Sequence, residues 1–304
     1  MKRTSVSTSR DTFRGVFAAM VTPMNAKEEI DFPQLRAFTN YLVRQGVHGL
    51  VPLGSTGEYY ALSAQEREQV LRSTLEVVAG RVPVVAGANA GSTREVIAYS
   101  RQAEQLGCAG VMLAPPYYSL PRLEELFAHF RAVNNAIGIP IVLYNYPGRT
   151  GVDMPPAFIE RLAGLKNVRY VKESTGEMPR ITELLRRCGD RLGVFCGCDT
   201  IALESLVMGA VGWIGGVVNV LPKSHVSLYE LAVVKKDYAA ARKVFFRLLP
   251  TLELMEGGHK YTQFVKAACG LAGHPVGPPR RPLMLPTAAE RVLLRKALSG
   301  TGGA

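Results

Sequence analysis

Short runs of consecutive apolar residues, rich in β-branched side chains, alternate along the chain with amphipathic stretches. Their starts lie roughly 20–35 residues apart, the spacing of a strand, a helix and two loops. Because these runs are apolar throughout rather than alternating, each predicted strand is expected to be covered on both faces, as in a parallel sheet. The predicted strands are Gly15–Pro23, Val47–Gly54, Val82–Gly87, Ala109–Ala114, Pro140–Tyr146, Val168–Glu173, Leu192–Gly197 and Ala210–Val217.

Amphipathic helical patterns fill the intervals between the predicted strands. Ser63 followed by Glu66 forms a capping box at one predicted start, and glycines follow several predicted helix ends. The predicted helices are Pro33–Gln45, Ala64–Val78, Thr93–Gln105, Arg122–Ile137, Pro156–Ala163, Met178–Arg187, Thr200–Met208 and Lys223–Lys235.

Eight strand-and-helix units predict an α/β fold, a closed (β/α)8 TIM barrel rather than an open doubly wound sheet. The first predicted strand is not followed by a G-x-G-x-x-G phosphate loop, which argues against a dinucleotide-binding fold. Further helices are expected beyond the eighth unit, divided by a proline-rich link. We therefore expect one domain, with a flexible leader over residues 1–14, the barrel over 15–236 and a helical extension over 237–304.

Composition narrows the function classes. The net charge of +11 comes from dispersed basic residues without interleaved aromatics, so no nucleic-acid partner is expected. No apolar run is long enough to span a membrane, and the basic start of the chain lacks the apolar core of a signal peptide, so a cytoplasmic location is expected. The five cysteines lack metal-ligand spacing and are predicted to be buried free thiols, with no metal bound.

Barrel enzymes place their catalytic groups at the carboxyl ends of strands. Lys172 ends an apolar run, and desolvation there would favour the neutral amine that attacks a carbonyl carbon. The alternative for this lysine is an ion pair, for example with Glu173.

Two other segments carry polar groups at strand ends. Tyr144 could move protons, and Arg149 could bind a carboxylate through two hydrogen bonds. Ser55 and Thr56 lie in a glycine-rich turn that could hold an anion. Taken singly, each also has a structural explanation: a rim aromatic, a surface ion pair or an ordinary turn.

Together these segments resemble one family. Gly54-Ser-Thr-Gly-Glu58, Tyr144-Asn-Tyr-Pro-Gly-Arg149-Thr-Gly and Val171-Lys172-Glu-Ser-Thr-Gly are similar to the signatures of the dihydrodipicolinate synthase and N-acetylneuraminate lyase family. The resemblance covers about residues 15 to 286, and its three motifs occur in the expected order at predicted strand ends.

The resemblance implies a lyase that forms a lysine imine with pyruvate or a related 2-oxo acid, without a metal or other cofactor. Lys172 matches the imine-forming residue and Tyr144 the proton relay, which Ser55 extends. Other matches are Thr56 for the pyruvate carboxylate, Arg149 for a second carboxylate, Gly197 and Ile214 for the pocket backbone, and Tyr118 for a tyrosine that enters a neighbouring subunit's site. A homotetramer or homodimer is therefore expected.

Departures from the family pattern leave the second substrate open. The synthases typically carry threonine at Ser55 and alanine at Ser174, whereas the sialic acid lyases have threonine at the latter position. Asp199 matches a polyol-binding acid of those lyases, and Ser174 and Asp199 are thus candidate substrate-binding residues. The pair Gly215-Gly216 lacks the serine or threonine of many relatives, and residues 258–263 resemble the sugar-acid dehydratases.

Three hypotheses follow. The first is an imine-forming lyase, with 4-hydroxy-tetrahydrodipicolinate synthesis as the best single prediction. A dehydratase, deaminase or aldolase acting on 2-keto-3-deoxy or hydroxylated 2-oxo acids is the alternative within that class. The second is a binding protein that retained the barrel and lost turnover. The third, a nucleic-acid binder, depends on net charge alone.

Overall fold

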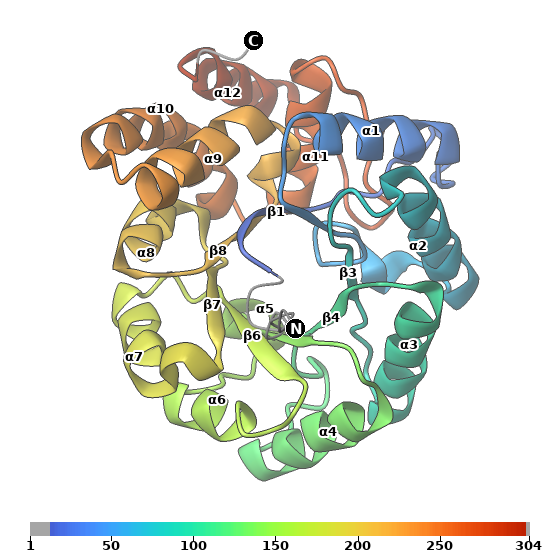
Figure 1. Cartoon of the computed structure of the whole chain (residues 1–304). Helices are drawn as coiled ribbons and strands as arrows, with labels where there is room; N and C mark the ends of the chain where they lie inside the picture. The colour runs from blue at the N-terminus through green and yellow to red at the C-terminus, as the bar shows by residue number, and fades with distance from the viewer. Residues whose placement is uncertain (1–12, 302–304) are drawn as a thin grey trace, which may run out of the picture.

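The structure, a computed structural model, describes residues 13–301. Eight parallel strands form a central ring, and helices surround it (Figure 1). The strands are β1 (Gly15–Ala19), β2 (Gly49–Val51), β3 (Val85–Gly87), β4 (Gly110–Leu113), β5 (Ile141–Asn145), β6 (Val168–Glu173), β7 (Gly193–Cys196) and β8 (Gly212–Gly215).

The ring closes through a weaker contact between β2 and β3. Hydrogen-bonded pairing runs in the order β2-β1-β8-β7-β6-β5-β4-β3. A parallel bridge between Leu50 and Val84 joins the two ends, and the amide of Gly87 donates to the carbonyl of Pro52 at 2.9 Å. The prediction of a (β/α)8 barrel is confirmed.

The predicted helices between the strands are present, with ends shifted by a few residues at most. They are α1 (Phe32–Arg44), α2 (Ala64–Val78), α3 (Thr93–Leu106), α4 (Leu123–Ala136), α6 (Pro156–Leu162), α7 (Met178–Cys188), α8 (Ala202–Met208) and α9 (Pro222–Tyr229), which continues as a π-helical turn, η6 (Glu230–Val234). A short helix, α5 (Pro147–Thr150), forms where only a loop was expected. It begins with a proline, whose fixed φ suits the first helical turn.

Side chains alternate between two hydrophobic clusters, one inside the barrel and one between the strands and the helices. In β6, Tyr170 belongs to the inner cluster and Val171 to the outer one. In β5, Val142 points inward and Leu143 outward. Because strand side chains alternate with a period of two, the next inward positions are Lys172 and Tyr144.

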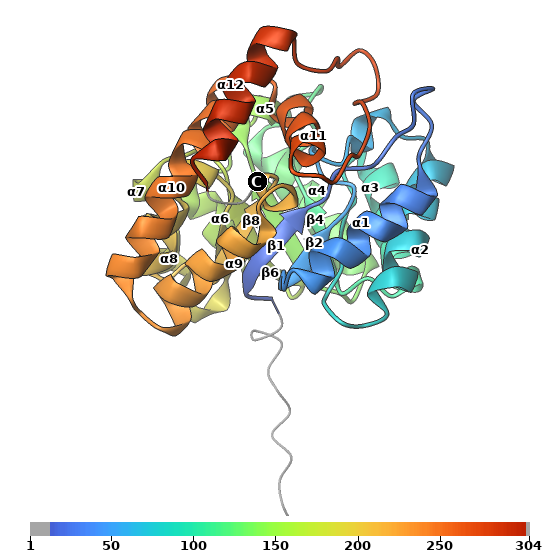
Figure 2. The same cartoon turned by 90° about the horizontal axis from the view of Figure 1, so that it is seen from above.

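The C-terminal extension consists of α10 (Tyr238–Gly257), α11 (Tyr261–Leu271) and α12 (Ala288–Ser299). Figure 2 shows α11, α12 and α5 at the same end of the barrel. The division into leader, barrel and extension stays a prediction, and most of the expected leader lies outside the described residues.

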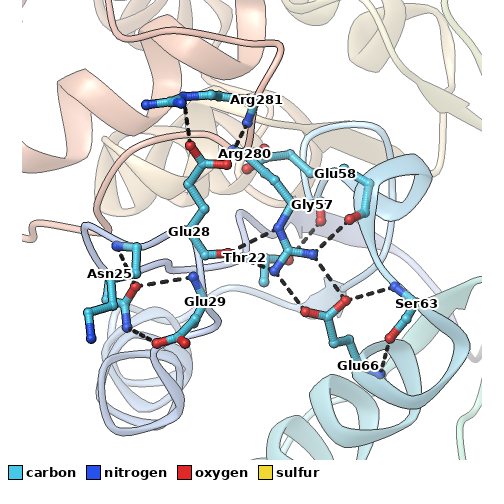
Figure 3. Close-up of polar contacts among 12 residues, drawn as sticks. Thr22, Asn25, Glu28, Glu29, Gly57, Glu58, Ser63, Glu66, Arg280 and Arg281 are labelled. Carbon is cyan, nitrogen blue, oxygen red and sulfur yellow. Dashed lines mark hydrogen bonds and ion pairs between the residues drawn. The ribbon is translucent and has the colours of Figure 1, made fainter.

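Charged groups hold the proline-rich link against the barrel. Lys266 of α11 donates to Glu58 at 2.6 Å and to the carbonyl of Pro278 at 2.8 Å, and neither side chain of this ion pair is exposed. The amide of Arg280 donates to the second Glu58 oxygen at 2.7 Å, and its guanidinium pairs with Glu66, as Figure 3 shows. The loop that carries Ser55 and Thr56 is thus joined to the extension.

Candidate active site

Lys172 occupies the barrel mouth because β6 places it on the inward face. It is paired in register with Tyr144 of β5, and its Nζ lies 4.3 Å from the centroid of the Tyr144 ring. Only 6% of its surface is exposed. Gly197 is required next to it, because a Cβ at that position would lie 2.7 Å from the Lys172 Cγ and 1.9 Å from the Ser174 Oγ.

The amine of Lys172 is buried without a close counter-ion. Burial lowers its pKa, against a smaller opposing attraction to Asp199 and Glu256. No residue within 13–301 makes an ion pair or hydrogen bond with its Nζ. The alternative of an ion pair with Glu173 is wrong. Glu173 faces outward, where it accepts from the side-chain amide of Asn145 at 3.0 Å and lies 3.8 Å from Arg180.

Tyr144 places a phenol next to the Lys172 amine at the barrel mouth. Burial raises its pKa, while the adjacent Ser55 hydroxyl acts in the opposite direction. The phenol is therefore protonated at neutral pH and can donate a proton to a neighbouring group. Its distance from Lys172 and its contact with Ser55 are compatible with a proton relay among the three residues.

These groups share one cavity of about 490 Å³ at the barrel mouth. That volume suits a small organic acid or a condensation product. The structure brings together eight residues that the sequence had singled out, namely Ser55, Thr56, Tyr144, Arg149, Lys172, Ser174, Gly197 and Ile214.

Tyr118 and Asp199 do not line the cavity. Tyr118 is 92% exposed, and its neighbour Tyr117 contributes to the wall instead. Asp199 is fully buried behind the wall. Its carboxylate accepts from the indole Nε1 of Trp213 at 2.8 Å and from the Tyr261 hydroxyl. A substrate hydroxyl would have to displace one of these donors to reach it.

Burial and a neighbouring carboxylate, Glu256, raise the pKa of Asp199 to about 7. Asp199 therefore changes charge near neutral pH. The amide of Asp199 donates to the Glu256 Oε1 at 2.8 Å, which connects the buried acid to the cavity wall.

The extension supplies a group of wall residues that sequence reasoning did not assign to the site: Glu256, His259, Tyr261, Thr262, Gln263 and Leu283. Tyr261 also explains the second glycine of the Gly215-Gly216 pair, whereas a Cβ at the first would lie 2.4 Å from the Asp199 carboxylate. The Tyr261 hydroxyl accepts from the Gly216 amide at 2.9 Å, and a Cβ at Gly216 would lie 2.4 Å from the Tyr261 ring. A tyrosine from α11 thus fills the space next to β8 and provides the hydroxyl that the glycines lack.

Ser174 is a second polar feature beside the lysine. Its hydroxyl is buried at the cavity and has no hydrogen-bond partner among residues 13–301. A buried polar group of this kind is normally satisfied by water or a ligand. Ser174 therefore offers a hydrogen-bonding position to a bound substrate.

Within the described part of the chain, no three His, Cys, Asp or Glu side chains are arranged to hold a metal ion. All five cysteines are buried and unpaired, which confirms the prediction of buried free thiols. No helix among residues 13–301 has the length and apolar character needed to cross a membrane.

Fold and site together define a (β/α)8-barrel enzyme with a buried amine and a phenol at its mouth. The family model of the dihydrodipicolinate synthetase family matches residues 12–300. The chain is 39% identical over 296 residues to a 4-hydroxy-tetrahydrodipicolinate synthase of Halorhodospira halophila, covering 95% of this chain and 97% of the relative. It is 38% identical over 293 residues to that of Syntrophobacter fumaroxidans, covering 95% and 99%.

Solved structures agree with the sequence relatives. The dihydrodipicolinate synthase of Acinetobacter baumannii, solved in complex with pyruvate, superposes with a TM-score of 0.92 at 32% identity, covering 96% of this chain and all (100%) of that one. A structure described as a putative dihydrodipicolinate synthetase of Pseudomonas aeruginosa superposes with a TM-score of 0.91 at 36% identity, covering 95% and 99%. The chain belongs to the dihydrodipicolinate synthetase family.

Proposed function

We propose that this protein is a 4-hydroxy-tetrahydrodipicolinate synthase that condenses pyruvate with aspartate semialdehyde through an imine on Lys172. The observation that carries the proposal is the buried Lys172 amine, which has no ion-pair partner among the described residues and lies against the Tyr144 ring. The family relatives named as this synthase and the pyruvate complex of the Acinetobacter enzyme support it.

The reaction begins when the neutral Lys172 amine adds to the pyruvate carbonyl, and loss of water leaves an imine. The imine withdraws electrons, so a methyl proton can leave to give an enamine, whose carbon attacks the aldehyde. The amino group of the semialdehyde then adds to the imine carbon, which closes the ring and releases the Lys172 amine. Tyr144 gives and takes the protons that these steps require, with Ser55 as the next member of the relay. No metal is required, because the imine itself stabilises the carbanion.

The remaining wall residues are assigned to binding. Thr56 holds the pyruvate carboxylate, and Arg149 binds the carboxylate of the semialdehyde through its planar guanidinium. Gly197 and Ile214 contribute backbone to the pocket around Lys172. Asp199 acts from behind the wall, through the hydrogen bond that its backbone amide donates to Glu256, rather than by direct contact.

A second candidate is supported by the free hydroxyl of Ser174, which could bond a hydroxyl on a longer 2-oxo acid. In that case the enzyme would be a dehydratase, deaminase or aldolase of hydroxylated 2-oxo acids. The same imine on Lys172 would serve either reaction.

Borohydride trapping tests the shared chemistry. Incubation with pyruvate and borohydride should raise the mass of the wild-type chain by one reduced pyruvyl group and leave Lys172→Ala unchanged. A wild-type chain without the adduct would refute the imine mechanism. Coupled assays then separate the candidates, one with pyruvate and aspartate semialdehyde, the other following 2-oxoglutarate semialdehyde formation from a keto-deoxy acid.

We also propose a cytoplasmic homotetramer or homodimer in which the exposed Tyr118 enters a neighbouring subunit's site. Exposure of a large aromatic ring at the barrel mouth supports this role. One similar solved structure is described as a monomeric variant of dihydrodipicolinate synthase, so light scattering on this chain is the direct measurement.

A further inference from the structure

One carboxylate faces the cavity among cationic and phenolic groups. Of the described residues that line the cavity, Glu256 is the only aspartate or glutamate, whereas Arg149 supplies a cation and Lys172 the reactive amine. Glu256 is the penultimate residue of α10, outside the barrel proper. The imine chemistry proposed above makes no use of it.

One oxygen of Glu256 is held by the protein and the other is available. Oε1 accepts from the amide of Asp199 at 2.8 Å, which fixes the orientation of the carboxylate. No residue within 13–301 donates a hydrogen bond to Oε2. The nearby acid does not take its place, because Asp199 is fully buried and does not line the cavity.

The negative charge of Glu256 influences the pKa values of the reacting groups. It acts on the Lys172 amine and on the phenols of Tyr144 and Tyr146. Arg149 acts on the same two phenols with the opposite sign. A substrate chain extending from the imine therefore meets a cation, Arg149, and an oriented carboxylate, Glu256, in one cavity.

We propose that Glu256 is a specificity-determining residue, which accepts a hydrogen bond from an ammonium or hydroxyl group on the chain of the substrate that reacts with the bound 2-oxo acid. The inference rests on the function proposed above. Aspartate semialdehyde carries a carboxylate for Arg149 and an ammonium group for Glu256. Pairing both charges would distinguish it from aldehydes that have the carboxylate alone.

Three four-carbon semialdehydes test this role, because they share the carboxylate and differ at one carbon, which bears an ammonium group, a hydroxyl group or hydrogen. They are aspartate semialdehyde, 2-hydroxy-4-oxobutanoate and succinate semialdehyde. kcat/KM with pyruvate is measured for each on wild type, Glu256→Gln, Glu256→Met and the control Glu253→Gln. Glu253 is exposed on the same helix and does not line the cavity.

Loss of a charge-assisted hydrogen bond should reduce the preference for aspartate over succinate semialdehyde by about 10- to 100-fold. Glu256→Gln keeps an oxygen for the Asp199 amide and should fold normally, while Glu256→Met removes the acceptor. The control should retain wild-type ratios, and all variants should form the pyruvyl adduct. A larger change for the amino than for the hydroxyl substrate identifies ammonium as the preferred donor, and the reverse identifies hydroxyl.

An unchanged preference in both Glu256 variants would overturn the inference, and so would loss of the pyruvyl adduct, since Glu256 would then act on the lysine. If wild type forms the adduct but consumes none of the semialdehydes, the proposed condensation fails instead. The same variants are then compared on 2-oxo acids with and without a chain hydroxyl. A preference that is unaltered there would equally reject the role of Glu256.

Discussion

Two lysines among residues 13–301 are buried, and they have opposite surroundings. Lys266 in α11 is held by Glu58 at 2.6 Å and by the Pro278 carbonyl, and both contacts favour a charged ammonium, although burial lowers the pKa of Lys266. Lys172 in β6 lies against the Tyr144 ring, and no described carboxylate is within ion-pair distance. The first arrangement holds segments of the chain together, whereas the second leaves an amine free to react. Burial alone therefore does not make a lysine reactive.

The two lysines should differ most in catalysis. Lys172→Met is expected to lower turnover on the order of 10⁴-fold or more, because no other described amine lies in the cavity to form the imine. Its free energy of unfolding should stay the same or rise, since an apolar side chain replaces a desolvated amine. Steady-state kinetics and urea titration measure the two effects. A variant that retains the pyruvyl adduct would contradict the comparison.

For the free energy of unfolding we expect the reverse order, with the larger loss on replacing Lys266. Lys266→Met leaves Glu58 buried without its cation and should cost about 3–5 kcal/mol of unfolding free energy. Folded molecules should still form the pyruvyl adduct. The double variant Glu58→Gln, Lys266→Met removes both charges, keeps an acceptor for the Arg280 amide and should recover part of the loss. If the double variant is no more stable than Lys266→Met, an unpaired charge is not the cause.

The next largest predicted effect is the loss of turnover when the phenol beside Lys172 is removed. Tyr144→Phe should reduce turnover by about 10²–10⁴-fold, the usual contribution of a positioned acid or base. Tyr170→Phe is a matched control, because Tyr170 lies in the same inner cluster and accepts from the Phe13 amide at 3.2 Å, away from the cavity. Equal losses in both variants would assign the effect to packing rather than to proton transfer.

The smallest predicted effect concerns an acid behind the cavity wall. Glu58 lies directly against the ammonium of Lys266. Asp199 has no such cation among the described residues, and burial and Glu256 raise its pKa from the ordinary value of 3.8 to about 7. Between these values the folded chain binds a proton that the unfolded chain has lost. The stabilisation from Asp199 is thus full below about pH 4 and is lost as pH rises through 7.

Asp199→Asn should make the unfolding free energy less dependent on pH across that interval. Urea titrations from pH 4 to 8 compare the variant with wild type, and Asp190→Asn, at an exposed position, serves as the control. A slope that persists in Asp199→Asn would assign the titration to another group.

Much of the site was predictable because local sequence controls it. Lys172 and Tyr144 end apolar runs, and the period of two along a strand carries both to the barrel interior. The same period sends Glu173 outward to Asn145 and Arg180, which decided between a reactive amine and an ion pair. The segment with Arg149 was recognised by its motif, although its helix, α5, was not expected.

The wall formed by the extension could not be predicted in this way. Glu256 and Tyr261 lie more than 80 residues from Lys172 in sequence, and no local pattern indicates that α10 and α11 close the cavity. The available signals were the resemblance of residues 258–263 to the sugar-acid dehydratases and Gly216, which leaves space that the Tyr261 ring fills. The boundaries of the strands were also overestimated, because apolar residues such as Met20 and Val21 continue past β1 and are buried outside the sheet.

The amino-acid sequence by itself determined the eight-unit barrel and the residues at its mouth, because hydrophobic periodicity and short motifs are properties of neighbouring residues. Only the tertiary structure decided which lysine has a counter-ion, that Asp199 lies behind the wall and that Glu256 faces the cavity. Those outcomes depend on contacts between elements far apart in the chain. They follow from how the helical extension packs on the barrel, and packing at that distance has no local signature.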